Sequence, residues 1–123
     1  MGGENADTYD DIARRAAQRL NGDLGRNLPA AVEAELQAGG RAPERYEPVT
    51  TVIALATLLL NVAKFAWDIY RDRKKDAKEV PSAETIARTI RLELKSDEGV
   101  SAEQRDKIID VVVEELLKEP PTA

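Results

Sequence analysis

The sequence predicts an all-α protein of about five helices, in which one long apolar helix in the middle of the chain is packed by two helical hairpins. Three observations predict this fold class. Apolar residues recur at helical spacing on both sides of the most hydrophobic stretch. Proline and glycine interrupt the chain where those segments end. Aromatic residues make up only 4% of the chain, so we expect a core built mainly from Leu, Ile, Val and Ala.

Residues 1–47 are expected to form an N-terminal helical hairpin followed by a linker. The first helix is predicted from about Asp7 to Asn21. The run NGDLGRNLP then breaks the helix, because two glycines and a proline interrupt it. A shorter helix from Pro29 to Ala38 follows, and Gly39-Gly40 ends it. The apolar positions of these two helices are Tyr9, Ile12, Ala13, Ala16, Leu20, Val32 and Leu36.

Residues 48–78 are expected to form the central hydrophobic helix. Its uncharged part runs from Val49 to Ala63, which is shorter than the roughly 20 apolar residues that a membrane-spanning helix needs. A helix that is apolar on most sides must be surrounded by other helices or by lipid. The polar residues of this segment fall on one narrow stripe, at Thr50, Thr57, Asn61, Lys64 and Asp68.

Two interpretations of the central helix follow from this pattern. In a soluble core, the polar stripe is the edge that reaches water, and Lys64 and Asp68 form an exposed ion pair. In a membrane, the helix spans from about Pro48 to Tyr70, with Trp67 and Tyr70 at the interface and the run RDRKK as a cytoplasmic flank. We favour the core, because the amphipathic helices on both sides need an apolar partner.

Residues 79–123 are expected to form a C-terminal αα-hairpin. Ser82 is the expected N-cap of a helix from Ala83 to Lys95. Ser101 and Gln104 have the spacing of a capping box and open the last helix, which two prolines end. The apolar stripes of the two helices are Ala83, Ile86, Ala87, Ile90 and Leu94, and Ile108, Ile109, Val112, Val113, Leu116 and Leu117.

The composition of the chain excludes several kinds of chemistry. The chain has no Cys and no His, which excludes disulfides, Cys/His zinc sites and imidazole general bases. Its net charge of −5 disfavours nucleic acid as a partner. The cluster Asp7, Asp10 and Asp11 lacks the pattern of a calcium loop and is expected to supply the negative start of a helix. We therefore expect no enzyme, no cofactor, no metal site and no small-molecule substrate.

The predicted function is a small protein–protein interaction module: an adaptor, a regulatory subunit or an oligomerising subunit. The outer helices are only modestly apolar, so we expect an uncovered patch on the central helix for a protein partner or for self-association. The alternative is a small single-pass or membrane-associated protein, anchored by residues 49–70, whose C-terminal hairpin works in the cytoplasm. The acidic N-terminus has no signal-peptide features, which favours the cytoplasm. The residues expected to bind the partner are Leu58, Leu59, Val62, Phe65 and Trp67.

Overall fold

The computed structural model describes residues 3–24, 27–37, 51–77, 80–94 and 100–120. Within these ranges the chain forms five α-helices and no strand, which confirms the predicted all-α class. The helices are α1 (Gly3–Leu20), α2 (Leu28–Gln37), α3 (Thr51–Ala77), α4 (Ala83–Glu93) and α5 (Ala102–Lys118).

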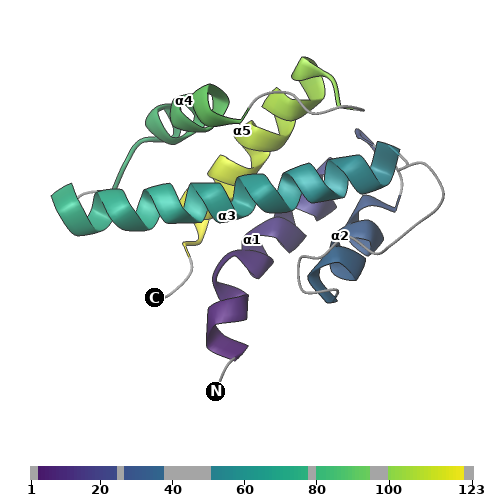
Figure 1. Ribbon diagram of the computed structural model, residues 1–123, viewed down its shortest axis with the longest axis horizontal. Helices are drawn as coiled ribbons and strands as arrows, with labels where there is room; N and C mark the ends of the chain where they lie inside the picture. The colour runs from purple at the N-terminus through teal and green to yellow at the C-terminus, as the bar shows by residue number, and fades with distance from the viewer. Residues whose placement is uncertain (1–2, 25–26, 38–50, 78–79, 95–99, 121–123) are drawn as a thin grey trace.

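The long helix α3 runs through the middle of the molecule and organises the fold. Figure 1 shows α1 and α2 on one side of α3, and α4 and α5 on the other. Each of the four shorter helices contacts α3. The two members of each predicted hairpin also contact one another, and α1 packs directly against α5. The α1–α5 contact therefore joins the N-terminal and C-terminal helices, in addition to the contacts that each makes with α3.

Local sequence signals mark the ends of several helices. The Ser82 hydroxyl accepts a hydrogen bond from the Thr85 backbone N–H at 3.1 Å, which caps α4. At α5 the Ser101 hydroxyl accepts from the Gln104 N–H at 3.1 Å, and the Gln104 side-chain oxygen accepts from the Ser101 N–H at 2.9 Å. Both predicted caps are confirmed. Gly22, with a φ of 97°, follows the end of α1 and takes up the left-handed conformation that favours glycine there.

Two helix boundaries differ from the sequence prediction by two residues or more. Helix α1 begins at Gly3 rather than near Asp7, so Asp10 and Asp11 lie inside the helix and not in its first turn. Helix α4 ends at Glu93 instead of Lys95, because Leu94 is already extended. Helix α3 continues through the charged run to Ala77, as the predicted range of 48–78 requires, since neither glycine nor proline interrupts it. The predicted linker at 41–47 and the start of the central helix at 48–50 lie outside the described residues.

The core lies between α3 and one side of each surrounding helix. Buried alanines occur on both α1 and α3, which contact each other, and larger aliphatic side chains are buried on all five helices. Aliphatic residues dominate, as the composition predicts. The largest fully buried side chains are Ile12, Leu20, Leu28, Val32, Leu55, Leu58, Leu59, Ile86, Ile90, Ile108, Ile109 and Leu116.

Candidate functional site

The five residues expected to bind a partner lie on α3, and most of them face the inside of the protein. Leu58, Leu59, Val62 and Trp67 are buried, with at most 4% of each residue exposed. Phe65 is half-buried and packs at the edge of the core. The other helices of the same chain thus cover four of the five. Their binding of another protein stays a prediction, and the exposed surfaces of the molecule must be considered instead.

The predicted polar stripe of α3 forms the side of the helix that is open to water. Asn61 and Lys64 are exposed, and Thr57 and Asp68 are half-buried. The expected ion pair between Lys64 and Asp68 is wrong, because the Asp68 carboxylate pairs with Arg71 at 3.1 Å. Arg71 lies three residues after Asp68 and Lys64 lies four residues before it. The Asp68 carboxylate therefore forms its ion pair with Arg71 and not with Lys64.

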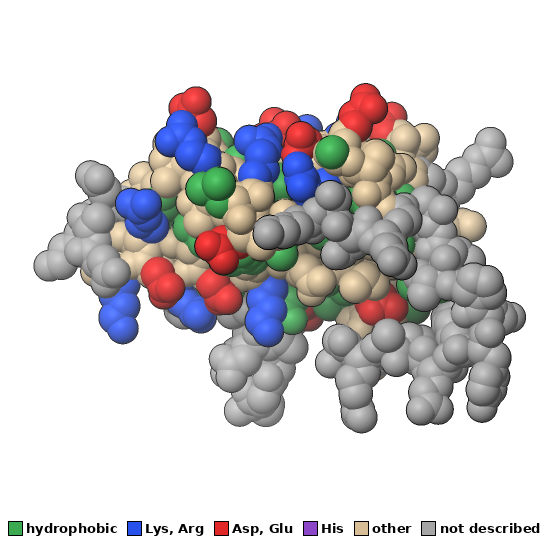
Figure 2. Space-filling view, turned by 45° about the horizontal axis from the view of Figure 1, so that its top comes forward, with side chains coloured by type: hydrophobic (Ala, Val, Ile, Leu, Met, Phe, Trp, Pro, Cys, Tyr) green, Lys and Arg blue, Asp and Glu red, His purple; other side chains and the backbone are tan. Residues whose placement is uncertain are grey.

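The C-terminal end of α3 carries four exposed cations, Arg71, Arg73, Lys74 and Lys75, which we call the cationic end of α3. Two buried aromatic rings lie beneath it: Trp67 and Tyr70 stack with their centroids 5.8 Å apart. Arg71 lies over the Trp67 ring and Lys74 over the Tyr70 ring, at 5.9 and 5.8 Å. Figure 2 shows Lys and Arg side chains at the end of the molecule where α3 terminates.

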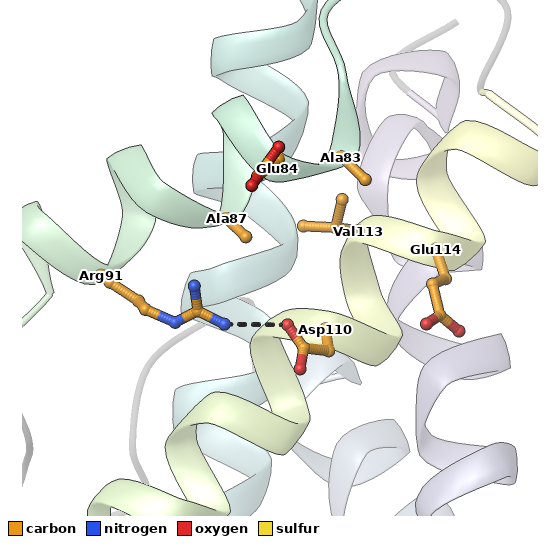
Figure 3. A pocket seen from close by; sticks show the side chains of 7 residues that line it. All are labelled: Ala83, Glu84, Ala87, Arg91, Asp110, Val113 and Glu114. Atoms are coloured by element: carbon orange, nitrogen blue, oxygen red, sulfur yellow. Dashed lines mark hydrogen bonds and ion pairs between the residues drawn. The ribbon is translucent and has the colours of Figure 1, made fainter.

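A small open groove lies between α4 and α5. Its volume is about 220 Å³, and we call it the α4–α5 groove. Figure 3 shows Ala83, Ala87 and Val113 turned toward this space, with Arg91 joined to Asp110 at one end and the Glu114 side chain extending away from α4. The complete lining consists of Ala83, Glu84, Ala87, Arg91, Asp110, Val113 and Glu114.

The charged rim of the groove is predominantly acidic. Three carboxylates, those of Glu84, Asp110 and Glu114, line it together with a single guanidinium, that of Arg91. Arg91 is already neutralised, because its guanidinium lies 3.0 Å from Asp110 and 3.4 Å from Asp106. Glu114 pairs with an arginine of α1 at 2.9 Å. When Arg19 and Asp106 are counted with the lining residues that they pair with, four carboxylates stand against two guanidinium groups, and Glu84 is the lining acid without an ion-pair partner among the described residues.

A second charged cluster lies where α1 crosses α5, and it consists of the buried Glu115 and two partly exposed arginines, Arg15 and Arg19. The Glu115 side chain is only 5% exposed and accepts hydrogen bonds from Arg15 at 3.0 Å and from Arg19 at 3.1 Å. Arg15 also donates to the backbone carbonyls of Glu115 and Glu119, at 3.0 Å each. These carbonyls belong to the end of α5 and need such donors. The cluster therefore joins α1 to α5 and caps α5.

The environment of Glu115 shifts the ionisation of its carboxyl group. Burial alone would raise its pKa, but hydrogen bonds from Arg15 and Arg19, and the nearby charge of Lys118, outweigh burial and hold the pKa of Glu115 below its usual value. The carboxylate is therefore the favoured form at neutral pH. Since both guanidinium groups already contact it and no reacting group adjoins it in the described residues, the cluster is suited to holding two helices together.

The described part of the chain contains no group of three or more Asp, Glu, Cys or His side chains that could hold a metal ion. Helix α3 contains one segment, Val52–Lys75, which is long and apolar enough to cross a membrane by length and composition, because an 18-residue stretch of it has a mean hydropathy of 1.7. In the structure 44% of that 18-residue stretch is buried inside the protein, and the core helices of soluble proteins share these properties.

The chain has no match among protein-family models, curated proteins or solved structures. The α4–α5 groove itself was not predicted from the sequence. One local signal was present: Ala83 and Ala87 are small residues one turn apart on α4, beside Glu84 and Arg91. Small residues at this spacing are common on helices and do not by themselves predict a groove. The groove can be recognised only when the side chains of α5 that face them are known.

Proposed function

We propose that this protein is a non-enzymatic protein–protein interaction module that receives a side chain of its partner in the α4–α5 groove. The observation that carries the proposal is the composition of this groove: an apolar floor of Ala83, Ala87 and Val113 beneath an acidic rim. A lysine or arginine side chain matches both parts, because its aliphatic stem covers apolar surface while its charged head reaches the carboxylates.

The size of the groove favours a protein partner over a small molecule. Its volume of about 220 Å³ is below the roughly 300–1,000 Å³ that is typical of pockets for small molecules. Its surroundings are also accessible: among the described helices α4 contacts α3 and α5 alone, and Leu92 on α4 is 73% exposed. A polypeptide bound across α4 would cover both the groove and this side chain.

Photo-crosslinking from two matched positions tests this function. Ala83 and Ala102 are both exposed, and each directly follows the serine that caps its helix, but Ala83 alone of the two lines the groove. We expect a photoreactive amino acid at position 83, expressed in cells, to capture a defined protein that position 102 does not capture. With that protein purified, Ala83→Trp should fill the groove and weaken binding by about tenfold or more, a loss of roughly 1.4 kcal/mol.

The matched control is Ala102→Trp, which places the same bulk at the start of α5 and should leave the affinity unchanged. Equal capture at both positions, or undiminished binding by the Ala83→Trp variant, would contradict the proposal. Circular dichroism of both variants establishes that each retains its helices before binding is measured.

A second candidate function is a membrane anchor, which the hydropathy of Val52–Lys75 favours. In that arrangement Asn61, Lys64 and Asp68 would have to avoid lipid, although they lie on the open side of α3. Purification without detergent, followed by light scattering on a sizing column, separates the two functions. A monodisperse soluble species excludes an obligatory membrane span. Aggregation that detergent relieves would favour the anchor over the soluble module.

A further inference from the structure

We propose that the α4–α5 groove binds the cationic end of α3 from a second copy of this chain, so that copies of the chain associate with one another. This inference rests on the proposed interaction function and names its partner. The two surfaces are formed by different residues of one molecule, and their charges are of opposite sign.

The cationic end of α3 can reach the groove of another copy, because it projects from the molecule and carries free cations. Figure 1 shows this end of α3 extending beyond α1 and α5 at the edge of the molecule. Arg71 is held by Asp68, and Lys74 lies over the Tyr70 ring. Among the ion pairs of the described residues, none involves Arg73 or Lys75, although both are exposed. These two cations are therefore available to an acidic surface on another molecule.

Most other arginines of the bundle differ from Arg73 in this respect. Their guanidinium groups already lie against carboxylates of the same chain, in α1 as well as in α4 and α5. The paired arginines are Arg14, Arg15, Arg19, Arg91 and Arg105. Among the described residues, cations without an ion-pair partner also occur singly, at Lys64, Arg88 and Lys118, whereas Arg73, Lys74 and Lys75 stand together at the cationic end of α3, beside the exposed Asp72.

The α4–α5 groove offers what such a cation requires. Glu84, on the first turn of α4, has no ion-pair partner among the described residues and stands at the rim. Ala83, Ala87 and Val113 supply an apolar floor for the stem of a lysine or arginine. The volume of about 220 Å³ suits one long side chain. Charge complementarity of this kind fixes the orientation of two surfaces and disfavours other pairings.

The groove and the cationic end are different surfaces, so each contact uses the groove of one copy and the cationic end of another. Two copies can therefore pair reciprocally about a two-fold axis, or several copies can associate head to tail into a closed ring or an open chain. The chain also carries a net charge of −5, which disfavours random contacts between copies and leaves the positive end of α3 as the part that an acidic groove attracts.

A charge-swap experiment on the full chain tests this contact. Light scattering and sedimentation velocity over a concentration series at low ionic strength should show an apparent mass that rises with concentration for the unaltered chain. Glu84→Lys alone and Arg73→Glu alone should each weaken association by about tenfold or more. The chain with both substitutions should recover affinity to within about threefold of the unaltered chain, because the pair is re-formed with its charges exchanged.

Two controls are matched to these substitutions. Glu103→Lys reverses an exposed acid in the first turn of α5, as Glu84→Lys does in α4, and Lys64→Glu reverses an exposed cation of α3 that belongs neither to the groove nor to the cationic end. Both should associate like the unaltered chain. If Arg73→Glu impairs folding, Lys75→Glu removes a neighbouring cation and takes its place in the swap.

A mass that stays that of one chain at every concentration would overturn the proposal. So would single reversals without effect, or a double variant as weak as the single ones. These results are distinguishable from a failure of the proposed function. If the Ala83→Trp variant loses a captured partner while the chain itself stays monomeric, the groove binds protein but its partner is not a second copy.

Discussion

Helix α5 is joined to its neighbours by charged side chains on two sides, and the two junctions differ in burial. The α1–α5 junction consists of Arg15, Arg19 and Glu115, whose carboxylate side chain is 5% exposed. The α4–α5 junction is built around Arg91, with Asp106 and Asp110 from α5, and these three side chains are 40–55% exposed. The ion-pair distances are similar, at 3.0–3.1 Å and 3.0–3.4 Å.

The distance between the charged atoms does not by itself determine how much an ion pair contributes to the free energy of unfolding, because the burial of the pair also matters. At the α4–α5 junction water screens the charges, and such a pair contributes at most about 1 kcal/mol. At the α1–α5 junction the carboxylate has lost its water, so it depends on the two guanidinium groups that replace it. Arg15 additionally serves the terminal carbonyls of α5, so one side chain supports both the junction and the helix end.

The largest effect is expected from Glu115→Ala. This substitution leaves Arg15 without its carboxylate partner at a site where that side chain is only 29% exposed. Removing one partner of a fully buried pair costs about 3–5 kcal/mol, and the partial exposure of both arginines reduces our expectation to about 2–3 kcal/mol. Equilibrium unfolding in urea measures the loss as a lower midpoint at an unchanged slope.

The neighbouring residue Glu114 provides the control for this prediction. Its side chain is 57% exposed and pairs with Arg19 alone, at 2.9 Å. Glu114→Ala should lower the free energy of unfolding by less than about 1 kcal/mol. Equal losses for the two substitutions would show that burial is not what separates Glu115 from an ordinary surface acid.

A smaller, pH-dependent effect sharpens the same comparison. The folded-state pKa of Glu115 lies below its usual value of 4.5, so its carboxylate form stabilises the fold above that pH. This contribution should be lost as the pH falls through the lowered pKa. The difference in unfolding free energy between the unaltered chain and Glu115→Gln should therefore be constant above the usual value and shrink below it. A difference that grows on acidification would contradict this assignment.

The features of the fold that the sequence predicts correctly are encoded within short segments. The capping of α4 by Ser82 depends on residues three apart, and so does the capping box of α5. The polar stripe of α3 likewise follows from helical spacing alone. The errors at Gly3 and Leu94 lie at helix ends, where small differences in stability decide between helix and loop.

The surfaces of the molecule depend on residues that are far apart in the sequence. Arg15 and Glu115 are separated by 100 positions, and no local pattern indicates that they meet. The α4–α5 groove combines alanines of α4 with side chains of α5, and its shape depends on the packing of the two helices. Apolar residues of α3 were predicted at a binding surface, but periodicity does not tell a covered face from an uncovered one.

The smallest effect is expected at the exposed junction. Arg91→Ala removes both contacts that this guanidinium makes with α5, yet the free energy of unfolding should fall by less than about 1 kcal/mol. Arg15→Ala, the corresponding change at the buried junction, should cost more, because it leaves Glu115 desolvated and two carbonyls of α5 without their donor. Urea unfolding of the two variants side by side tests the comparison directly. If Arg91→Ala lowers the free energy of unfolding as much as Arg15→Ala does, then the ion pairs between α4 and α5 stabilise the fold as much as those between α1 and α5. Burial would then not explain which of the two junctions contributes more to stability.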